Sequence, residues 1–112
     1  MLSKKYRLFH KKDFERVFKQ GKFISEKFLA LKYFKNSLKE SRFGIIVSQK
    51  VSKKSNKRNI IKRRIREVLK KNIKEIKNGY DTVILTKPEI IDKDYQKIEE
   101  VTESLFKKAK LF

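Results

Sequence analysis

The stretch Lys57-Arg58-Asn59-Ile60-Ile61-Lys62-Arg63-Arg64-Ile65-Arg66 combines apolar residues at helical spacing with a dense run of cations. Four of the seven arginines of the chain fall within it, whereas lysine supplies most of the positive charge elsewhere. Arginine carries a planar fork that grips phosphate with two parallel hydrogen bonds and stacks on bases, whereas lysine carries a mobile, hydrated point charge. The stretch therefore predicts a helix that packs by one side and grips phosphate by another.

The apolar pattern extends this helix from about residue 56 to residue 76. Its members recur every three or four residues and cover one stripe of the helix: Ile61, Ile65, Val68, Leu69, Ile73 and Ile76. Arg63 and Arg66 lie opposite the stripe, and Arg64 and Lys62 lie on its two flanks. The helix is therefore expected to be buried along one face and cationic around the rest.

Regular elements are also expected on both sides of this helix. Before it, we expect a helix at 13–20, a long strand at 23–34, and a second strand at 42–48 that runs antiparallel to the first through a short polar loop. After it, the apolar run 80–86 predicts a buried strand, and residues 95–109 predict a last helix. The expected fold is thus a single-domain α+β fold of order α-β-β-α-β-α, with one small mixed sheet.

Several single residues refine this prediction. Gly21 is placed to end the first helix, and Asp92 or Asp94 is placed to cap the last one. Gly44 lies inside an expected strand, which indicates a bulge or a close backbone contact. Asn59 is open to two interpretations, a helix N-cap or a contact with nucleic acid, and it can serve as both.

Composition points to a polyanionic partner. The chain has 112 residues, the size of one domain, and a formal net charge of +19. Nucleic acid is the first candidate partner and an anionic membrane surface the second. No apolar run approaches the roughly 20 residues needed to span a bilayer, no signal peptide is recognisable, and cysteine is absent. We therefore expect a cytoplasmic protein without disulfides.

The positive charge is concentrated in the middle of the chain. Residues 50–74 contain twelve Lys or Arg and a single acid, Glu67, whereas residues 80–112 contain six bases and seven acids. The binding surface is therefore expected in the central segment, and the C-terminal third is expected to be structural.

Residues for catalysis are not recognisable in the sequence. His10, the only histidine, precedes a helix and is expected to cap it, and Asp92 and Asp94 are expected to be exposed caps rather than metal ligands. Phosphate-binding glycine loops and zinc-ligand spacings are absent from the sequence. These observations predict a binding protein with no catalytic residues and no metal site of its own.

Several separated motifs resemble the bacterial ribonuclease P protein family. The motifs are Asp13-Phe14-x-x-Val17-Phe18-x-x-Gly21, Arg42-x-Gly44-x-x-Val47-Ser48, Arg58-Asn59, Lys62-Arg63 and Arg66-Glu67, and they occur in the family's order over nearly the whole chain. Two positions depart from the family pattern: Ile60 stands where an arginine is usual, and Ser52 stands where a glycine is usual.

The resemblance implies a fold and a function. It implies a left-handed β-α-β crossover, against the general right-handed rule. It further implies that the chain joins a catalytic RNA, which needs magnesium and removes the 5′ leader from precursor tRNA by endonucleolytic hydrolysis. The RNA would perform the chemistry, and the protein alone would not be catalytic. No membrane or protein partner is implied.

The same resemblance assigns two sets of candidate residues. The RNA contacts are expected at Lys50, Lys53, Lys54, Lys57, Arg58, Asn59, Lys62, Arg63, Arg64 and Arg66. A cleft for the single-stranded leader is expected to be lined by Phe14, Phe18, Leu31 and Tyr33, although such aromatic residues are more often part of a core. Alternatives are a ribosomal or other structural RNA-binding protein, and a DNA-binding module.

Overall fold

The computed structural model describes residues 2–112 and contains three α-helices, four strands and two short 3-10 helices in that part of the chain. In chain order they are η1 (Lys4–Tyr6), α1 (Lys11–Gln20), β1 (Lys22–Glu26), β2 (Leu29–Lys35), β3 (Arg42–Ile46), α2 (Ser55–Asn72), β4 (Tyr80–Thr86), η2 (Pro88–Asp92) and α3 (Tyr95–Lys108). The α+β class is confirmed, and the order of the main elements is α-β-β-β-α-β-α.

The long strand expected at 23–34 is two strands joined by a tight turn. β1 and β2 pair antiparallel, with Ser25 opposite Ala30 and Glu26 opposite Leu29. The chain reverses at Lys27, whose φ of 52° lies in the left-handed region that residues other than glycine rarely adopt. No glycine, proline or asparagine marks this turn, so the sequence pattern gave no sign of it.

The sheet has the order β1-β2-β4-β3. β4 pairs antiparallel with β2 and parallel with β3, so β2 and β3 do not form the expected antiparallel pair. The physical reason lies in β4: Asp81 to Ile84 are buried, and Val83 and Ile84 have no exposed surface, so this strand occupies the centre of the sheet. β2 and β3 therefore lie on either side of it.

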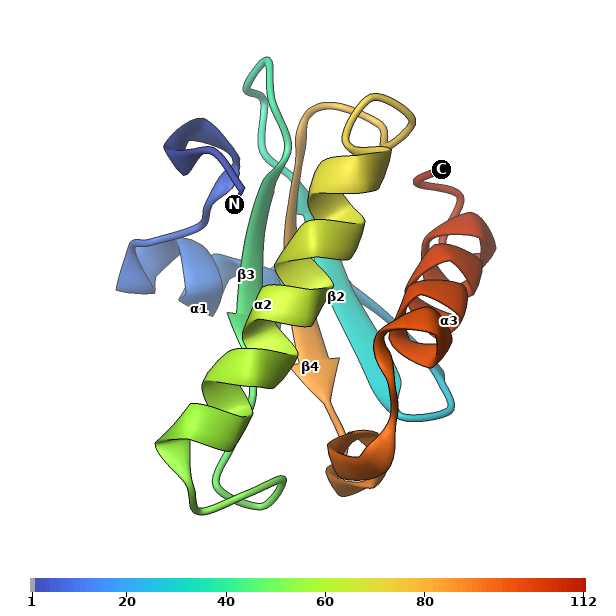
Figure 1. The fold of residues 1–112 in the computed structure, drawn as a ribbon. Helices are drawn as coiled ribbons and strands as arrows, with labels where there is room; N and C mark the ends of the chain where they lie inside the picture. The colour runs from blue at the N-terminus through green and yellow to red at the C-terminus, as the bar shows by residue number, and fades with distance from the viewer. Residues whose placement is uncertain (1) are drawn as a thin grey trace.

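The connection from β3 through α2 to β4 is left-handed. In Figure 1, β3 and β4 both point downward, α2 passes in front of the sheet, and β4 lies to the right of β3. Crossovers between parallel strands are almost always right-handed, so this connection is an exception to the general rule. It agrees with the crossover implied by the family resemblance.

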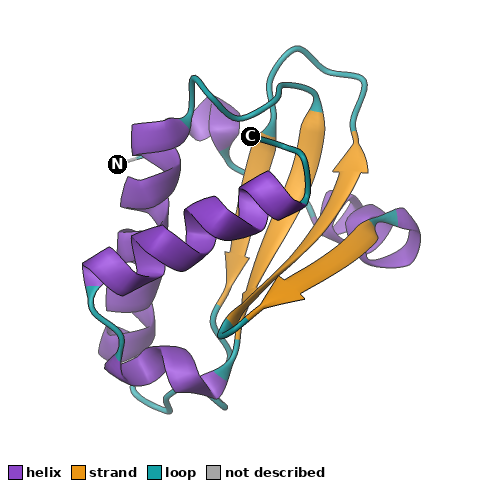
Figure 2. Cartoon of the chain, turned by 90° about the vertical axis from the view of Figure 1, so that its right-hand side faces the viewer, coloured by secondary structure: helices purple, strands orange, loops and turns teal. Residues whose placement is uncertain are grey.

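The sheet separates two hydrophobic clusters. α2 and α3 cover one face, and α1 lies against the other, as Figure 2 shows. The larger cluster contains Leu29, Leu31 and Ile84 of the sheet with Ile65 and Leu105 of the two covering helices. The smaller one joins Leu8, Val17 and Val83, with Phe14, Phe34, Ile46 and Leu85 packed against it.

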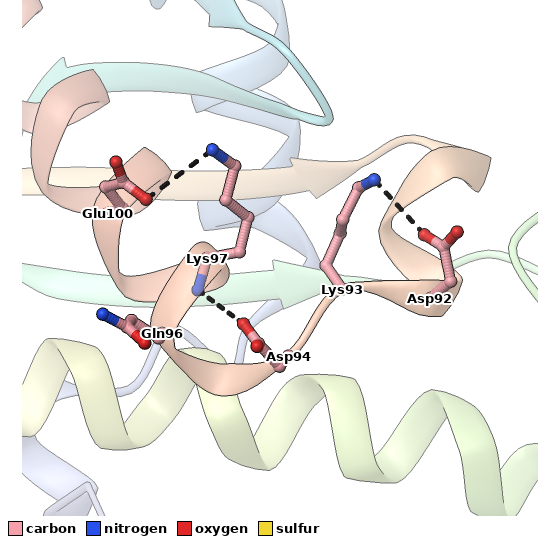
Figure 3. Close-up of a pocket in the computed structure, with 6 residues that line it drawn as sticks. All are labelled: Asp92, Lys93, Asp94, Gln96, Lys97 and Glu100. Atoms are coloured by element: carbon pink, nitrogen blue, oxygen red, sulfur yellow. Dashed lines mark hydrogen bonds and ion pairs between the residues drawn. The ribbon is translucent and has the colours of Figure 1, made fainter.

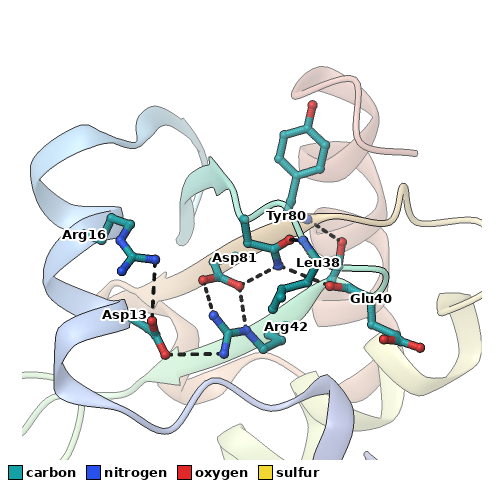
Figure 4. Close-up of polar contacts among 9 residues, drawn as sticks. Asp13, Arg16, Leu38, Glu40, Arg42, Tyr80 and Asp81 are labelled. Carbon is teal, nitrogen blue, oxygen red and sulfur yellow. Dashed lines mark hydrogen bonds and ion pairs between the residues drawn. The ribbon is translucent and has the colours of Figure 1, made fainter.

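A buried ion pair ties α1 to the sheet. Asp81, only 1% exposed, accepts two hydrogen bonds from the Arg42 guanidinium, at 2.9 and 2.7 Å, and one from the Asn36 amide at 2.8 Å. Arg42 also lies 3.3 Å from the carboxylate of Asp13 on α1, and Asp13 in turn lies 3.7 Å from Arg16 (Figure 4). Hydrogen bonding to Asp81 raises the pKa of Arg42, although partial burial opposes the rise.

We predict that Arg42→Ala destabilises the fold by about 2–4 kcal/mol, because it leaves the Asp81 carboxylate buried without its cation. The estimate lies toward the lower end of the range for such pairs because the Arg42 side chain is 21% exposed. Urea denaturation of the purified chain measures the loss. Arg16→Ala is the matched control: its ion pair is 44% exposed on the arginine side, so it is expected to cost less than about 1 kcal/mol. Equal losses in the two variants would contradict the role of the buried pair.

Candidate nucleic-acid interface

α2 is held against the sheet by the apolar stripe that the sequence predicted. Ile61, Ile65, Val68 and Leu69 are buried, with at most 3% of their surface exposed. The helix ends at Asn72 rather than at residue 76, and the chain then turns so that Ile76 still reaches the core. Because only one side of α2 is buried, its cationic sides face outward.

All ten predicted RNA contacts have at least part of their surface open to solvent. Lys50, Lys53, Lys54, Lys57, Asn59 and Arg63 are exposed, and Arg58, Lys62, Arg64 and Arg66 are half-buried. The surface formed by these residues, here called the α2 surface, includes the loop before the helix as well as its first three turns. The structure thus places the predicted residues together, on one element and the segment leading into it.

Two arginines of the α2 surface are fixed by backbone carbonyls. Arg58 donates a hydrogen bond of 2.8 Å to the carbonyl of Ser52, and Arg64 donates one of 3.1 Å to the carbonyl of Lys93. The first braces the loop against the helix, and the second ties the helix to the segment before α3. A carbonyl carries no formal charge, so both guanidinium groups keep their positive charge for a further partner.

A second pair of arginines gathers at the edge of the α2 surface. Burial lowers the pKa of Arg66, and the nearby positive charge of Arg7 lowers it further. Arg7 donates a hydrogen bond to the carbonyl of Leu2, and a hollow of about 160 Å³ lies among Arg7, Arg66 and Phe9. Arg7 was not predicted, because it precedes the first regular helix and stands outside the basic run.

Ile60, at the position where the family has arginine, is also on the surface. It is 36% exposed and lies beside Ile91, which is 42% exposed, around a hollow of about 190 Å³ that Lys57 and Arg64 also line. The α2 surface therefore has a small apolar area between its cations.

The N-cap interpretation of Asn59 and the expected cap at His10 are both wrong. Asn59 is the fifth residue of α2, whose N-cap position is Lys54, so Asn59 does not cap the helix. Residues 55–58 are already helical, so the helix begins four residues before this asparagine. His10 occupies the N-cap position of α1, but its side chain makes no capping hydrogen bond.

The carboxylates before α3 are used locally. Asp94 caps α3 by accepting a hydrogen bond of 2.9 Å from the backbone N–H of Lys97, as the sequence predicted. Asp92 lies in η2, 3.4 Å from the ammonium group of Lys93 (Figure 3). Within residues 2–112, no three His, Cys, Asp or Glu side chains are grouped so as to hold a metal ion.

The four residues predicted to line one cleft lie on opposite faces of the sheet. Leu31 is fully buried in the larger cluster, and Tyr33 packs on the same side. Phe14 packs against the smaller cluster, and the ring of Phe18, also on α1, lies beneath the ammonium group of Lys32. The prediction that Leu31 and Tyr33 share a cleft with Phe14 and Phe18 is therefore wrong, because strand alternation turns them toward α2 and α3.

An open aromatic area remains on the α1 side of the sheet. Phe18 is 38% exposed, and the Lys32 ammonium lies 5.6 Å from its ring and donates a hydrogen bond of 2.8 Å to its carbonyl. Phe23, 59% exposed, pairs across the strands with Lys32 and so shares its face. We call Phe18, Phe23 and Lys32 the α1-side aromatic area. The sequence did not reveal it, because the turn at Lys27 was missed and Phe23 was assigned to the same strand as Lys32.

Comparisons with known proteins identify the family. A family model described as Ribonuclease P matches residues 2–110. The ribonuclease P protein component of Synechocystis is 41% identical over 109 residues, covering 96% of this chain and 88% of its relative. That of Clostridium botulinum (strain 657) is 41% identical over 102 residues, covering 90% and 91%.

Solved structures agree in fold. The ribonuclease P protein of Staphylococcus aureus superposes with a TM-score of 0.88 at 30% identity, covering 96% of this chain and 97% of that one. The protein from Thermotoga maritima superposes with a TM-score of 0.84 at 30% identity, covering 91% and 96%. The chain therefore belongs to the family of bacterial ribonuclease P protein components, which are parts of an endoribonuclease holoenzyme.

Among residues 2–112, none of the helices combines the length and the apolar character that crossing a bilayer requires.

Gly44 sets the position of α1. A Cβ atom built on Gly44 would lie 2.4 Å from the ring of Phe14, so the glycine admits this ring and confirms the expected close contact, here with a side chain.

We predict that Gly44→Ala displaces α1 and costs about 1–3 kcal/mol in the free energy of unfolding. Phe14→Leu in the same chain should recover part of the loss, because a smaller side chain leaves room for the new methyl group. Additive losses in a double-mutant cycle by urea denaturation would contradict the contact.

Proposed function

We propose that this chain is the protein subunit that binds the catalytic RNA of ribonuclease P and assists the removal of the 5′ leader from precursor tRNA. The observation that carries the proposal is the α2 surface: ten polar or cationic residues, open to solvent, anchored by a buried stripe on one rigid helix and the loop before it. Such a surface suits a folded RNA, whose closely spaced phosphates release counterions when cations replace them.

The chemistry is assigned to the RNA rather than to this chain. The residues of the α2 surface can hold phosphates but carry no general base or metal ligand. In the proposed holoenzyme the RNA positions magnesium ions, and the protein raises the local positive potential, so that fewer magnesium ions are needed for folding and substrate binding. This role implies a cytoplasmic location, where precursor tRNA is made.

Leader binding is assigned to the α1 side of the sheet. We propose that single-stranded leader nucleotides contact Phe18 and Phe23, with Lys32 holding a phosphate between them. Two exposed aromatic rings and a cation on one face are the elements of a single-strand platform. Phe14 contributes by packing α1 against the sheet, and Leu31 and Tyr33 are not included.

The ribosomal and DNA-binding alternatives lose their support. The family match extends over residues 2–110 and so covers all the separated motifs, not only the basic helix. A DNA-binding helix-turn-helix needs a helix and a tight turn before its recognition helix, whereas β3 and a loop precede α2.

We predict that Arg63→Ala weakens the activity of the reconstituted holoenzyme at low magnesium more than at high magnesium, because added magnesium replaces the lost positive charge. The affinity for the catalytic RNA should also depend less steeply on salt, with the slope of log affinity against log salt reduced by about 0.7–0.9. A magnesium titration of precursor tRNA cleavage, with a salt series of binding measurements, checks both effects.

Lys71→Ala is the matched control for this test. Lys71 lies on the same helix, but its ammonium group is 2.6 Å from the Glu99 carboxylate and so is already paired. A Lys71 variant as defective as the Arg63 variant would contradict the assignment, as would wild-type behaviour of Arg63→Ala across the titration.

Protein incubated with precursor tRNA without the catalytic RNA should release no leader, and cleavage in that sample would overturn the assignment of chemistry to the RNA.

We predict that Phe18→Ala lowers the affinity of the holoenzyme for precursor tRNA by about 1–3 kcal/mol, the usual contribution of one base stacked on an aromatic ring. Its affinity for mature tRNA, which has no leader, should stay unchanged. Equilibrium binding of both tRNAs measures the difference. Phe9→Ala is the control, because Phe9 is also an exposed ring, 53% against 38% for Phe18, at a different place, near Arg66. Parallel losses for both tRNAs would refute leader stacking at Phe18.

A further inference from the structure

A basic cavity lies outside both the α2 surface and the α1-side aromatic area. It has a volume of about 640 Å³, within the range of roughly 300–1,000 Å³ in which small ligands are bound. Five segments line it: the end of α1, the start of β1, the end of β2, the turn before β4 with the first residue of that strand, and the end of α3 with the residues that follow it. Five lysines belong to its wall: Lys22, Lys35, Lys77, Lys108 and Lys110.

The cavity lies at the opposite end of the fold from the first turns of α2. β2 ends at Lys35, which pairs with Tyr80 at the start of β4, and both belong to its wall. In Figure 1 the C-terminus, which follows the end of α3, lies at the top, whereas the first turn of α2 lies at the bottom. The cavity is therefore not an extension of the part of α2 that bears Arg58 and Arg63.

The backbone holds five lysines together around this cavity. The N–H of Lys77 donates a hydrogen bond of 2.7 Å to the carbonyl of Leu111, which fastens the segment after α3 to the turn before β4. Lys110 turns the chain with a φ of 61°, and Lys22 and Lys35 approach from the sheet.

The charge of this group is largely uncompensated. Lys108 lies 3.9 Å from Glu26, and no Asp or Glu belongs to the cavity wall within residues 2–112. Gathering like charges in one place works against folding, so the arrangement suits an anionic ligand that removes the repulsion.

Aromatic rings form the other part of the wall. Tyr33 and Tyr80 pack edge to face, with their ring centres 6.3 Å apart, and both are only half-buried. β1 pairs with β2 only as far as Tyr33, so Phe34 and Lys35 extend beyond the edge strand and leave the side of β2 open. Lysines beside partly exposed aromatic rings are the combination with which proteins bind single-stranded nucleic acid.

We propose that this cavity binds a short single-stranded RNA segment, with phosphates on the lysines and a base against Tyr33. Its concave shape and modest volume admit nucleotides of a single strand but not the side of a duplex. This binding is separate from the α2 surface and from the α1-side aromatic area, and it does not depend on precursor tRNA being the substrate.

Photocrosslinking tests the proposal. The full-length chain is irradiated with a decauridylate that carries 4-thiouridine, and the crosslinked peptides are located by mass spectrometry. Crosslinks are expected at residues 33–35 and 108–110, in addition to residues on α2. Crosslinks confined to 50–66, to 14–18 and to Phe23 would overturn the proposal.

A charge-matched pair of variants gives an independent measurement. Lys35→Ala/Lys77→Ala should reduce the slope of log affinity for decauridylate against log salt by about 1.4, from about 0.7 for each phosphate contact on a single strand. Lys12→Ala/Lys39→Ala removes the same charge from exposed lysines outside the cavity and should change the slope by less than half as much. Equal changes in the two pairs would refute a built site. Circular dichroism establishes that each variant is folded.

Competition with inorganic phosphate distinguishes a nucleotide site from a simple anion site. If phosphate displaces decauridylate from residues 33–35 at comparable concentration, the rings play no part and the RNA assignment is overturned.

Reconstitution with catalytic RNA separates the two proposals of function. Normal precursor processing without crosslinks at the cavity removes only this inference, and crosslinks at the cavity without processing remove only the proposed function.

Discussion

Burial of one apolar stripe of α2 against the sheet is the interaction on which the rest of the structure depends. A chain with a formal net charge of +19 resists compaction, so the folded state must place its cations outward while it forms a core. α2 meets both requirements, because Ile61, Ile65, Val68 and Leu69 are buried while the arginines point away from them. The same packing holds the cationic surface in place, which would lower the entropy cost of the proposed binding to a folded RNA.

The central position of β4 organises everything else. Because both faces of β4 are buried, it contributes to both hydrophobic clusters: Ile84 to the larger one and Val83 to the smaller. It also carries Asp81, through which Arg42 reaches Asp13 and thereby holds α1. The position of the α1-side aromatic area thus depends on a charge pair buried at the start of this strand.

The two basic regions at opposite ends of the fold differ in construction. The α2 surface is formed by one helix and the loop before it and is rich in arginine, with two guanidinium groups fixed by carbonyls of neighbouring segments. The cavity at the other end is concave and lined by lysines and tyrosines. The longest dimension of the protein is 36 Å, so one RNA, or two segments of a complex, could contact both regions at once. The high positive charge is therefore gathered in two regions of different construction rather than spread as a uniform coat.

The sequence by itself determined the helices and strands whose hydrophobic residues recur with a clear period, and the side of each that faces solvent. The stripe of α2, the buried run of β4, the cap at Asp94 and the solvent-facing position of the ten predicted contact residues all follow from spacing within one element, and the structure agrees with each. Their role in binding RNA remains a proposal. What only the tertiary structure decided was how separate elements meet.

The turn at Lys27 carries no glycine or proline signal, so two strands looked like one, and the faces of Leu31, Tyr33 and Phe18 could not be assigned. The placement of β4 between β2 and β3 depends on total burial rather than on any local pattern. For the same reason Arg7 beside Arg66, and the lysines around the basic cavity, could not be foreseen. Local periodicity fixes which side of an element is buried, but contacts between distant segments are set by the packing of the whole chain.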